Sequence, residues 1–98
     1  MKFDFHPEAL AEFQDAAQRY RLNQNEAGLR LVARVEDAID RILESPLRWR
    51  ILEHDVRRCL TRVFPYAVLY TIEPEFVLII AVMHCHREPG YWRKRISG

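Results

Sequence analysis

Several features that define common protein classes are missing from this sequence of 98 residues. It has two cysteines, Cys59 and Cys85, which are too few for a disulfide scaffold and fit a reducing compartment. Its three glycines do not form the glycine-rich loop that cradles phosphate. No apolar signal region opens the sequence, and the most apolar run, residues 76–83, is too short to cross a bilayer. We therefore expect a cytoplasmic protein without a membrane segment.

Residue patterns of the common catalytic and metal sites are also missing. Serine is scarce, and no nucleophile has small flanking residues. Cys59 alternates with Arg58 and Leu60, so we interpret it as a small core residue. His84 and His86 share one face of a strand, but no further ligands stand at zinc-site spacing. We expect no metal and no cofactor, and we interpret both histidines as structural or surface residues.

Length and composition predict a single globular domain over residues 1–98. The charge, however, is unevenly distributed along the chain. Residues 1–46 have a balance of −3, whereas residues 47–98 have a balance of +4. One interpretation is a polarised surface whose basic part faces an acidic partner. The other is a mixed, solvated surface without a specific partner.

Hydrophobic spacing in the first half predicts one strand and a helix hairpin. Residues 2–6 alternate between polar and apolar side chains, which indicates a half-buried strand. Pro7 suits the first position of a helix, and a polar break at 23–25 separates that helix from a second one. The second helix should end at Ser45, because the residue before a proline avoids helical geometry. The predicted apolar faces consist of Leu10, Phe13, Ala17 and Tyr20 in the first helix and of Leu31, Val32, Val35, Ile39, Ile42 and Leu43 in the second.

The second half predicts three strands and a short tail. Residues 47–55 suggest an irregular segment anchored by Trp49, and residues 91–96 suggest a short terminal helix. The expected order is β-α-α-β-β-β. This is an α+β fold in which the N-terminal strand and the helix hairpin pack on a mainly antiparallel sheet, followed by a short C-terminal helix or tail. The strands are expected over residues 56–64, 66–72 and 76–83.

The strand predicted at residues 76–83 is apolar throughout, although a strand covered on one face should alternate. Either it is central and the C-terminal segment covers its second face, or a partner covers that face. The residues that follow it combine cations, imidazoles and aromatic rings, which suits an anionic partner. Taken singly, each could equally decorate an exposed strand or cap the core. The candidate binding residues are Arg57, Arg58, Arg62, Arg87, Tyr91, Trp92 and Arg95.

RNA cleavage is one chemistry that such residues could perform. Arginines would stabilise the pentavalent phosphate, and a histidine or tyrosine would move protons. The candidate catalytic residues for this reaction are Arg58, His84, Arg87 and Tyr91.

A set of short motifs extends over nearly the whole sequence. They are F-x-P-E-A at 5–9, V-E-x-A-x-x-x-I at 35–42, Ser45-Pro46, V-R-R at 56–58, F-P-Y-x-V-x-Y at 64–70, A-V-x-H-x-x-R at 81–87 and P-G-Y-W-x-x-R at 89–95. Together these motifs resemble the RelE/ParE toxin superfamily of bacterial type II toxin–antitoxin modules. The resemblance implies a β-α-α-β-β-β fold, a plasmid-stabilisation-type module and a hetero-oligomer with a small antitoxin, whose C-terminal segment usually wraps the toxin.

The superfamily has two branches with different targets. RelE-like members cleave messenger RNA on the ribosome, whereas ParE-like members poison DNA gyrase and are not nucleases. RelE-like nucleases typically carry an arginine directly after the tyrosine that here is Tyr66, where this chain has Ala67. They also favour lysines on the preceding strand, where it has Arg58 and Leu60, although Arg87 matches. The resemblance favours a ParE-like gyrase inhibitor; the alternatives are a RelE-like ribosome-dependent endoribonuclease and a non-toxic relative that merely binds its partner.

Overall fold

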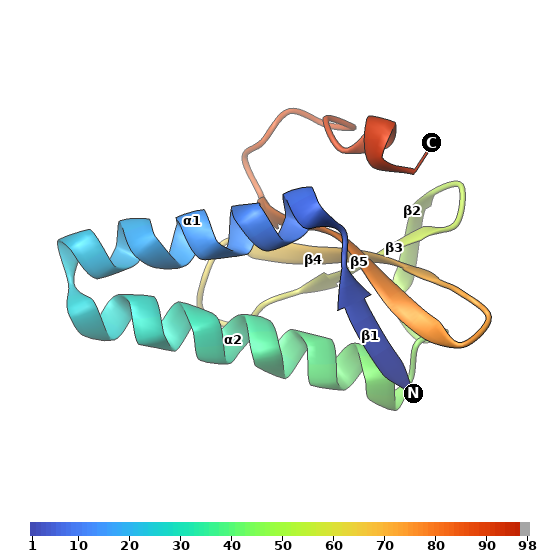
Figure 1. The fold of residues 1–98 in the computed structure, drawn as a ribbon, viewed down its shortest axis with the longest axis horizontal. Helices are drawn as coiled ribbons and strands as arrows, with labels where there is room; N and C mark the ends of the chain where they lie inside the picture. Colours follow the sequence, from blue (N-terminus) through green and yellow to red (C-terminus); the bar gives the residue numbers. More distant parts are fainter. Residues whose placement is uncertain (97–98) are drawn as a thin grey trace.

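The computed structural model describes residues 1–96 as a helix hairpin on a five-stranded sheet (Figure 1). The strand order is β1-β5-β4-β3-β2, with β1 parallel to β5 and every other neighbouring pair antiparallel. The predicted α+β class is therefore confirmed, with one strand more than expected. No helix in the described part of the chain is long and apolar enough to span a membrane. The elements are β1 (Lys2–Phe5), α1 (Pro7–Asn23), α2 (Asn25–Glu44), β2 (Arg50–Glu53), β3 (Val56–Leu60), β4 (Tyr66–Ile72), β5 (Phe76–His84) and the 3-10 turn η1 (Arg93–Arg95).

The two helices begin and end where local chemistry allows. α1 starts at Pro7, and the imidazole Nδ1 of His6 caps it by accepting the backbone N–H of Glu8 at 3.1 Å. Gln24 is extended and separates the helices, so α2 folds back along α1 (Figure 1). α2 ends at Glu44, directly before Ser45-Pro46, as predicted. The hairpin covers one face of the sheet.

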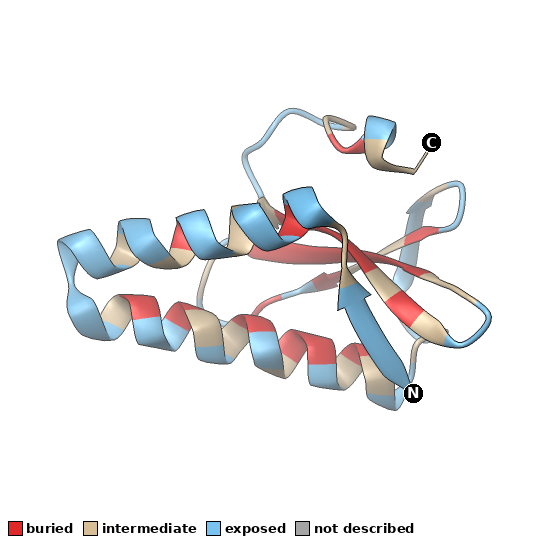
Figure 2. Ribbon diagram, viewed as in Figure 1, coloured by how far each residue is buried: buried red, intermediate tan, exposed pale blue. Residues whose placement is uncertain are grey.

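The main core lies between the hairpin and the sheet, and Figure 2 shows the buried positions of α2 on the side that faces the strands. The polar and exposed positions of both helices face solvent, as amphipathic spacing requires. The fully buried members include Leu31, Val35 and Ile42 from α2 and Cys59, Val68, Tyr70, Val77 and Ile79 from the strands. The interpretation of Cys59 as a core residue is thus confirmed.

A second, smaller cluster lies on the opposite face of the sheet. Trp92, in the C-terminal segment, is 3% exposed and packs there against residues of β3, β4 and β5. β5 lies between β1 and β4 in the sheet. Of the two explanations for its apolar sequence, the central position covered by the C-terminal segment is the one observed. The buried residues of this cluster are Val56, Ala67, Leu69, Ile80, Ala81 and Trp92.

A β-bulge in β5 also contributes to its unbroken apolar sequence. Leu69 pairs with Ala81 and Tyr70 pairs with Ile79, so Ile80 is an extra residue with no partner in β4. Ile80 and Ala81 consequently both belong to the second cluster. The alternation of side chains shifts by one residue at this point, which removes the simple two-residue period from the sequence.

Three boundaries differ from prediction. Residues 50–53 form the edge strand β2 instead of an irregular segment; Ile51 and Leu52 are both exposed there, so no alternation revealed the strand. The strand predicted over 56–64 ends at Leu60, because Thr61 turns the chain by donating its N–H to the carbonyl of Tyr66 at 2.9 Å. The helix predicted over 91–96 is the single turn η1.

Candidate functional site

The C-terminal segment folds back onto α1 through one carboxylate, that of Glu12. Arg95 donates from Nη1 to Glu12 Oε1 at 2.7 Å and from Nη2 to Oε2 at 3.1 Å. Tyr91 donates its hydroxyl to Oε2, and the backbone N–H of Val82 donates to Oε1 at 3.2 Å. We call these four residues, Glu12, Val82, Tyr91 and Arg95, the Glu12 cluster. A bidentate ion pair of this kind fixes both position and orientation.

The Glu12 cluster forms where β5 continues beyond the end of β1. β1 pairs with β5 from Phe76 to Ile79, and α1 begins directly afterwards. The backbone groups beyond this point need other partners, because unpaired strand edges are unfavourable when buried. Glu12 accepts the N–H of Val82, and Arg95 Nη1 donates to the carbonyl of Ile80 at 3.0 Å. Two side chains therefore replace the missing strand.

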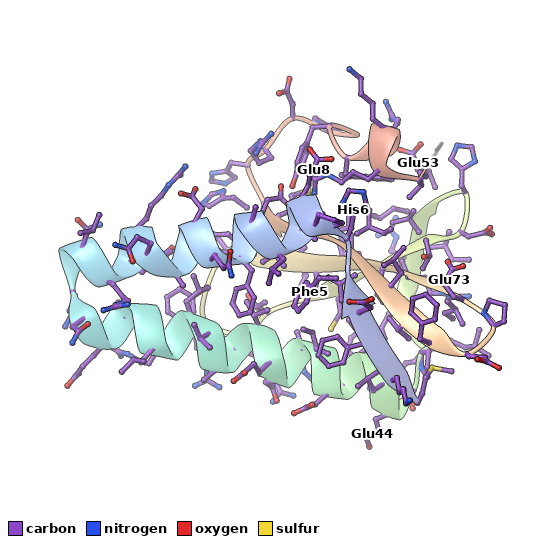
Figure 3. All side chains as sticks on the ribbon, viewed as in Figure 1. Phe5, His6, Glu8, Glu44, Glu53 and Glu73 are labelled. Carbon is purple, nitrogen blue, oxygen red and sulfur yellow. The ribbon has the colours of Figure 1, made fainter. Side chains whose placement is uncertain are left out.

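Further ion pairs hold the C-terminal turn in place. Glu8 on α1 and Glu53 on β2 come from different elements, and both lie beside this turn (Figure 3). Glu8 Oε2 is 3.8 Å from Arg95 Nε, and Glu53 Oε1 is 2.9 Å from Arg93 Nη2. The Arg95 side chain is 9% exposed, so its charge is largely removed from water and depends on Glu12.

Burial and hydrogen bonding shift the titration of two members of the Glu12 cluster. Burial raises the pKa of Tyr91, and the hydrogen bond to Glu12 raises it further. Burial alone would lower the pKa of Arg95, but its hydrogen bonds and charge interactions with Glu12 outweigh this, so the pKa of Arg95 is raised. Tyr91 therefore stays protonated at neutral pH, and Arg95 stays charged.

A hollow of about 80 Å³ lies beside the Glu12 cluster. One side is formed by α1, the other by the end of β5 and the segment after it. The Arg87 guanidinium lies 3.8 Å from the centre of the Tyr91 ring, a cation–π contact. Three of the four candidate ribonuclease residues are thus brought together, and Arg58 is not among them. The lining residues are Glu12, Asp15, Ala16, Arg19, Tyr66, Val82, His84, Arg87 and Tyr91.

The polar groups of this hollow are engaged with one another. His84 Nδ1 accepts the N–H of His86 at 3.0 Å, so the neutral imidazole carries its proton on Nε2 and has no free acceptor nitrogen. Asp15 pairs with Arg19 at 2.8 Å. Arg95 neutralises Glu12 and Arg19 neutralises Asp15, so Arg87 is the one lining arginine without a carboxylate partner among these pairs. The chemistry of the hollow fits attachment of the C-terminal segment better than proton transfer.

The structure places the remaining candidate residues apart from the hollow. Arg57 donates to the carbonyls of Leu47 and Trp49 at 3.1 and 2.8 Å and so holds the segment that follows α2. Arg58 is opposite Leu69 in the register of β3 and β4, on the face of the second cluster. The remaining two candidates differ in exposure: Trp92 is buried in that cluster, whereas the Arg62 side chain is 63% exposed.

Three charged residues of the hollow were missed by sequence reasoning, namely Glu12, Asp15 and Arg19. A signal was present, since positions three, four and seven apart share one face of a helix. The polar stripe on α1 resembled an ordinary solvated face, because its partner Arg95 lies 83 residues away in the sequence. Within residues 1–96, no three His, Cys, Asp or Glu side chains gather as metal ligands.

Comparison with known proteins first defines the fold. The structure is similar to a solved structure titled "Chromosomal ParDE TA system from P. aeruginosa", with a TM-score of 0.76 and 15% sequence identity. The match covers 86% of this chain and 95% of that chain, so the two share a fold. A search of curated protein sequences found no match.

The sequence comparison then defines the family. A family model described as "ParE toxin of type II toxin-antitoxin system, parDE" matches residues 3–89. This chain belongs to the ParE toxin family. The resemblance to the ParE-like branch is therefore confirmed.

Proposed function

We propose that this protein is the toxin of a plasmid-stabilisation-type module, acts in the cytoplasm, and arrests growth by inhibiting DNA gyrase until a cognate antitoxin neutralises it. The family match over residues 3–89 is the observation that carries the proposal. The similar solved structure supports it, since its title names a ParDE toxin–antitoxin system.

The state of the candidate catalytic residues favours inhibition by binding over RNA cleavage. The Tyr91 hydroxyl is donated to Glu12, and its raised pKa keeps its proton in place at neutral pH. A general base needs a free acceptor nitrogen, but Nδ1 of His84 already accepts the N–H of His86. These observations disfavour the ribonuclease alternative, which predicts that the same side chains are free to react.

Exposed apolar side chains support the presence of an antitoxin. Leu22 and Leu29, near the tip of the helix hairpin, are 76% and 65% exposed, and Leu47 after α2 is 74% exposed. β2 is also the last strand of the sheet within residues 1–96, so a partner segment could pair along its outer edge. An antitoxin that wraps the toxin would bury such surfaces in the complex.

The test is controlled expression with two separate readouts, the DNA-damage response and the integrity of messenger RNA. In parallel, purified toxin is added to gyrase, ATP and plasmid DNA. We expect a DNA-damage response, loss of supercoiling activity and intact messenger RNA. The antitoxin encoded beside the toxin should reverse these effects when added in excess.

Cleaved messenger RNA with unaffected gyrase would instead establish the ribonuclease alternative. Tyr91→Phe sharpens the distinction, because it removes the hydroxyl that a tyrosine-dependent ribonuclease needs. A gyrase inhibitor should keep its activity in the folded variant. A toxin that binds the antitoxin but changes neither readout would be the non-toxic relative.

A further inference from the structure

The loop between β3 and β4, residues 61–65, holds an aliphatic side chain in an unfavourable backbone conformation. Val63 has a φ of +75°, and the N–H of Phe64 donates to the carbonyl of Arg62 at 2.9 Å. This is a γ-turn with positive φ at its centre, a rare and strained arrangement that β-branched residues almost never adopt. Val63 is 79% exposed, so packing of its side chain in the core does not explain the strained conformation.

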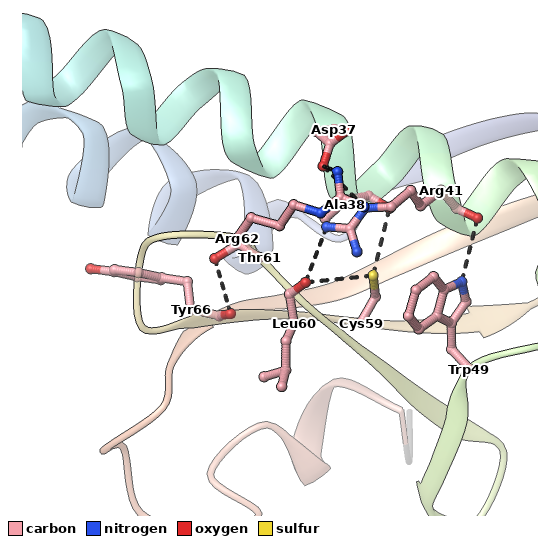
Figure 4. A network of polar contacts seen from close by, with 9 residues as sticks. All are labelled: Asp37, Ala38, Arg41, Trp49, Cys59, Leu60, Thr61, Arg62 and Tyr66. Atoms are coloured by element: carbon pink, nitrogen blue, oxygen red, sulfur yellow. Dashed lines mark hydrogen bonds and ion pairs between the residues drawn. The ribbon is translucent and has the colours of Figure 1, made fainter.

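The surrounding structure imposes this conformation on the loop. Thr61 donates its hydroxyl to the carbonyl of Phe64 at 2.9 Å, which closes the loop on itself. Arg41 on α2 donates from Nη2 to the carbonyl of Leu60 at 3.1 Å, and Asp37 lies 3.8 Å from the Arg62 guanidinium (Figure 4). The strain is thus held by contacts with α2, and Val63 is fixed at the tip. Strain retained in this way is characteristic of functional positions.

Leu60 and Arg62 lie close to Val63 in the sequence and provide an apolar and a cationic side chain. Leu60 is 48% exposed and points away from α2 (Figure 4), and the Arg62 side chain is largely in solvent. Cys85 donates its N–H to the carbonyl of Pro65 at 2.8 Å, which brings the turn after β5 alongside the loop. That turn contains Arg87, whose guanidinium lies against the Tyr91 ring and belongs to the hollow beside the Glu12 cluster.

These groups indicate the chemistry of a partner. An aliphatic tip requires an apolar recess, and the exposed guanidinium of Arg62 favours carboxylates near that recess. A protein surface provides both. Nucleic acid gains little from valine, which neither stacks on a base nor forms hydrogen bonds.

We propose that the loop of residues 61–65, with Val63 at its tip and Arg62 beside it, is the surface by which the toxin docks on its protein target. The inference rests on the proposed function, because the target is the enzyme that the toxin inhibits. The docking surface is distinct from the Glu12 cluster, which holds the C-terminal segment.

The test uses Val63→Asn in the full-length toxin. Asparagine tolerates positive φ, so the loop keeps its shape while the aliphatic tip is lost. The matched control is Leu22→Gln, which removes an apolar side chain of similar exposure, 76%, on α1. The measurements are gyrase inhibition, antitoxin affinity and thermal stability.

For Val63→Asn we expect the concentration for half-inhibition to rise about tenfold or more, with antitoxin affinity unchanged and melting temperature unchanged or higher. The control should match the wild type in gyrase inhibition and melting temperature; its antitoxin affinity is expected to fall, because Leu22 belongs to the surface that we assign to the antitoxin.

Each other outcome overturns the inference in a recognisable way. If the wild type and Val63→Asn inhibit gyrase equally, the docking surface is elsewhere and the proposed function stands. If Val63→Asn loses antitoxin affinity but keeps inhibition, the loop belongs to the antitoxin interface. If the wild type cleaves messenger RNA and leaves gyrase unaffected, the proposed function fails and the docking inference with it. Val63→Gly gives a second measurement. Glycine adopts positive φ without strain, so this variant should be at least as stable as the wild type. A loss of gyrase inhibition by Val63→Gly could therefore not be assigned to unfolding.

Discussion

At the residue scale, Glu12 joins the beginning of the chain to its end. Its carboxylate accepts hydrogen bonds from Val82, Tyr91 and Arg95, and its side chain is 17% exposed. A buried ion pair adds little compared with an apolar pair, but removal of one partner leaves the other charge uncompensated. The contribution of Glu12 to the stability of the fold therefore depends on the presence of Arg95.

The first prediction follows from this dependence. Glu12→Gln removes the countercharge of Arg95, so we expect the free energy of unfolding to fall by about 3 kcal/mol. Glu8→Gln is the control, because Glu8 is 67% exposed and 3.8 Å from Arg95, and its loss should cost about 0.5 kcal/mol or less. Unfolding in urea measures both values. Equal losses in the two variants would show that the Glu12 cluster does not hold the C-terminal segment.

The second prediction concerns alkaline pH. Burial raises the pKa of Tyr91 above that of an unfolded tyrosine, which is about 10. The folded state therefore retains a proton that the unfolded state releases, and this contribution to stability is complete below about pH 10 and declines above it. The free energy of unfolding of the wild type should fall between about pH 10 and 11.5, and that of Tyr91→Phe should fall less steeply over the same range. Parallel curves would contradict the assignment.

At the scale of elements, the close packing of α1 against α2 at Gly28 depends on the absence of a side chain there. A Cβ atom built on Gly28 would lie 2.9 Å from the carbonyl oxygen of Ala17 and would also collide with Cγ of Arg21. The Arg21 side chain can move, whereas the Ala17 carbonyl belongs to the backbone of α1. Glycine at this position lets the two helices pack side by side.

The third prediction is that Gly28→Ala destabilises the protein in spite of the better helix propensity of alanine. Overpacking of this kind costs about 1–3 kcal/mol, and the gain in propensity is about 1 kcal/mol, so we expect a net loss of about 1 kcal/mol. Leu29→Ala, at the neighbouring exposed position, should change stability by less than about 0.5 kcal/mol. The melting temperatures of the two variants provide the comparison. A Gly28→Ala variant that melts higher than the wild type would show that the hairpin can separate without loss.

Most elements could be predicted because their signals are local. Pro7 and Ser45-Pro46 act through the backbone dihedrals of adjacent residues, and they bound the helix hairpin as predicted. β2 lacked a local signal, because an edge strand with exposed Ile51 and Leu52 has no apolar alternation. The end of β3 depends on a hydrogen bond from Thr61 to Tyr66, which is a tertiary contact.

The candidate site was predicted less completely than the fold. Arg87, Tyr91 and Arg95 were chosen from their order along the chain, and the structure does bring them together. The role of Arg95 in holding the C-terminal segment could not be predicted, because it depends on Glu12 at the other end of the sequence. The contacts of Arg57 with two backbone carbonyls likewise arise from the fold of residues 47–49. The exposure of a side chain and the identity of its hydrogen-bond partners are set by the folded structure, so they could not be predicted from local sequence.

At the scale of the whole molecule, the acidic first half and the basic second half of the chain are joined by ion pairs. Arg95 meets Glu12 and Glu8, and Arg62 lies near Asp37. Part of the charge difference along the sequence is therefore neutralised inside the fold instead of appearing as two oppositely charged surfaces. The contrast in charge between the two surfaces is therefore smaller than the sequence alone suggests. Arg87 remains an exposed cation after the end of β5.

The fourth prediction is that the antitoxin stabilises the folded toxin. A ligand that binds the folded state alone adds about 3–4 kcal/mol at hundred- to thousandfold excess over its dissociation constant. The exposed leucines at positions 22, 29 and 47 provide apolar surface for such binding. Thermal unfolding with and without the product of the neighbouring gene measures the effect. Equal melting temperatures would count against a cognate pair.

The position of the Glu12 cluster also has a kinetic consequence. Glu12 and Arg95 are separated by 83 residues, and the loss of chain entropy on closing a loop increases with its length. We expect contacts of such long range to form late, after the hairpin and the central strands have assembled. A weakened cluster should then accelerate unfolding and leave the rate of folding almost unchanged. The contact between the two ends of the chain would thus determine the lifetime of the folded toxin, and not the time that it needs to fold.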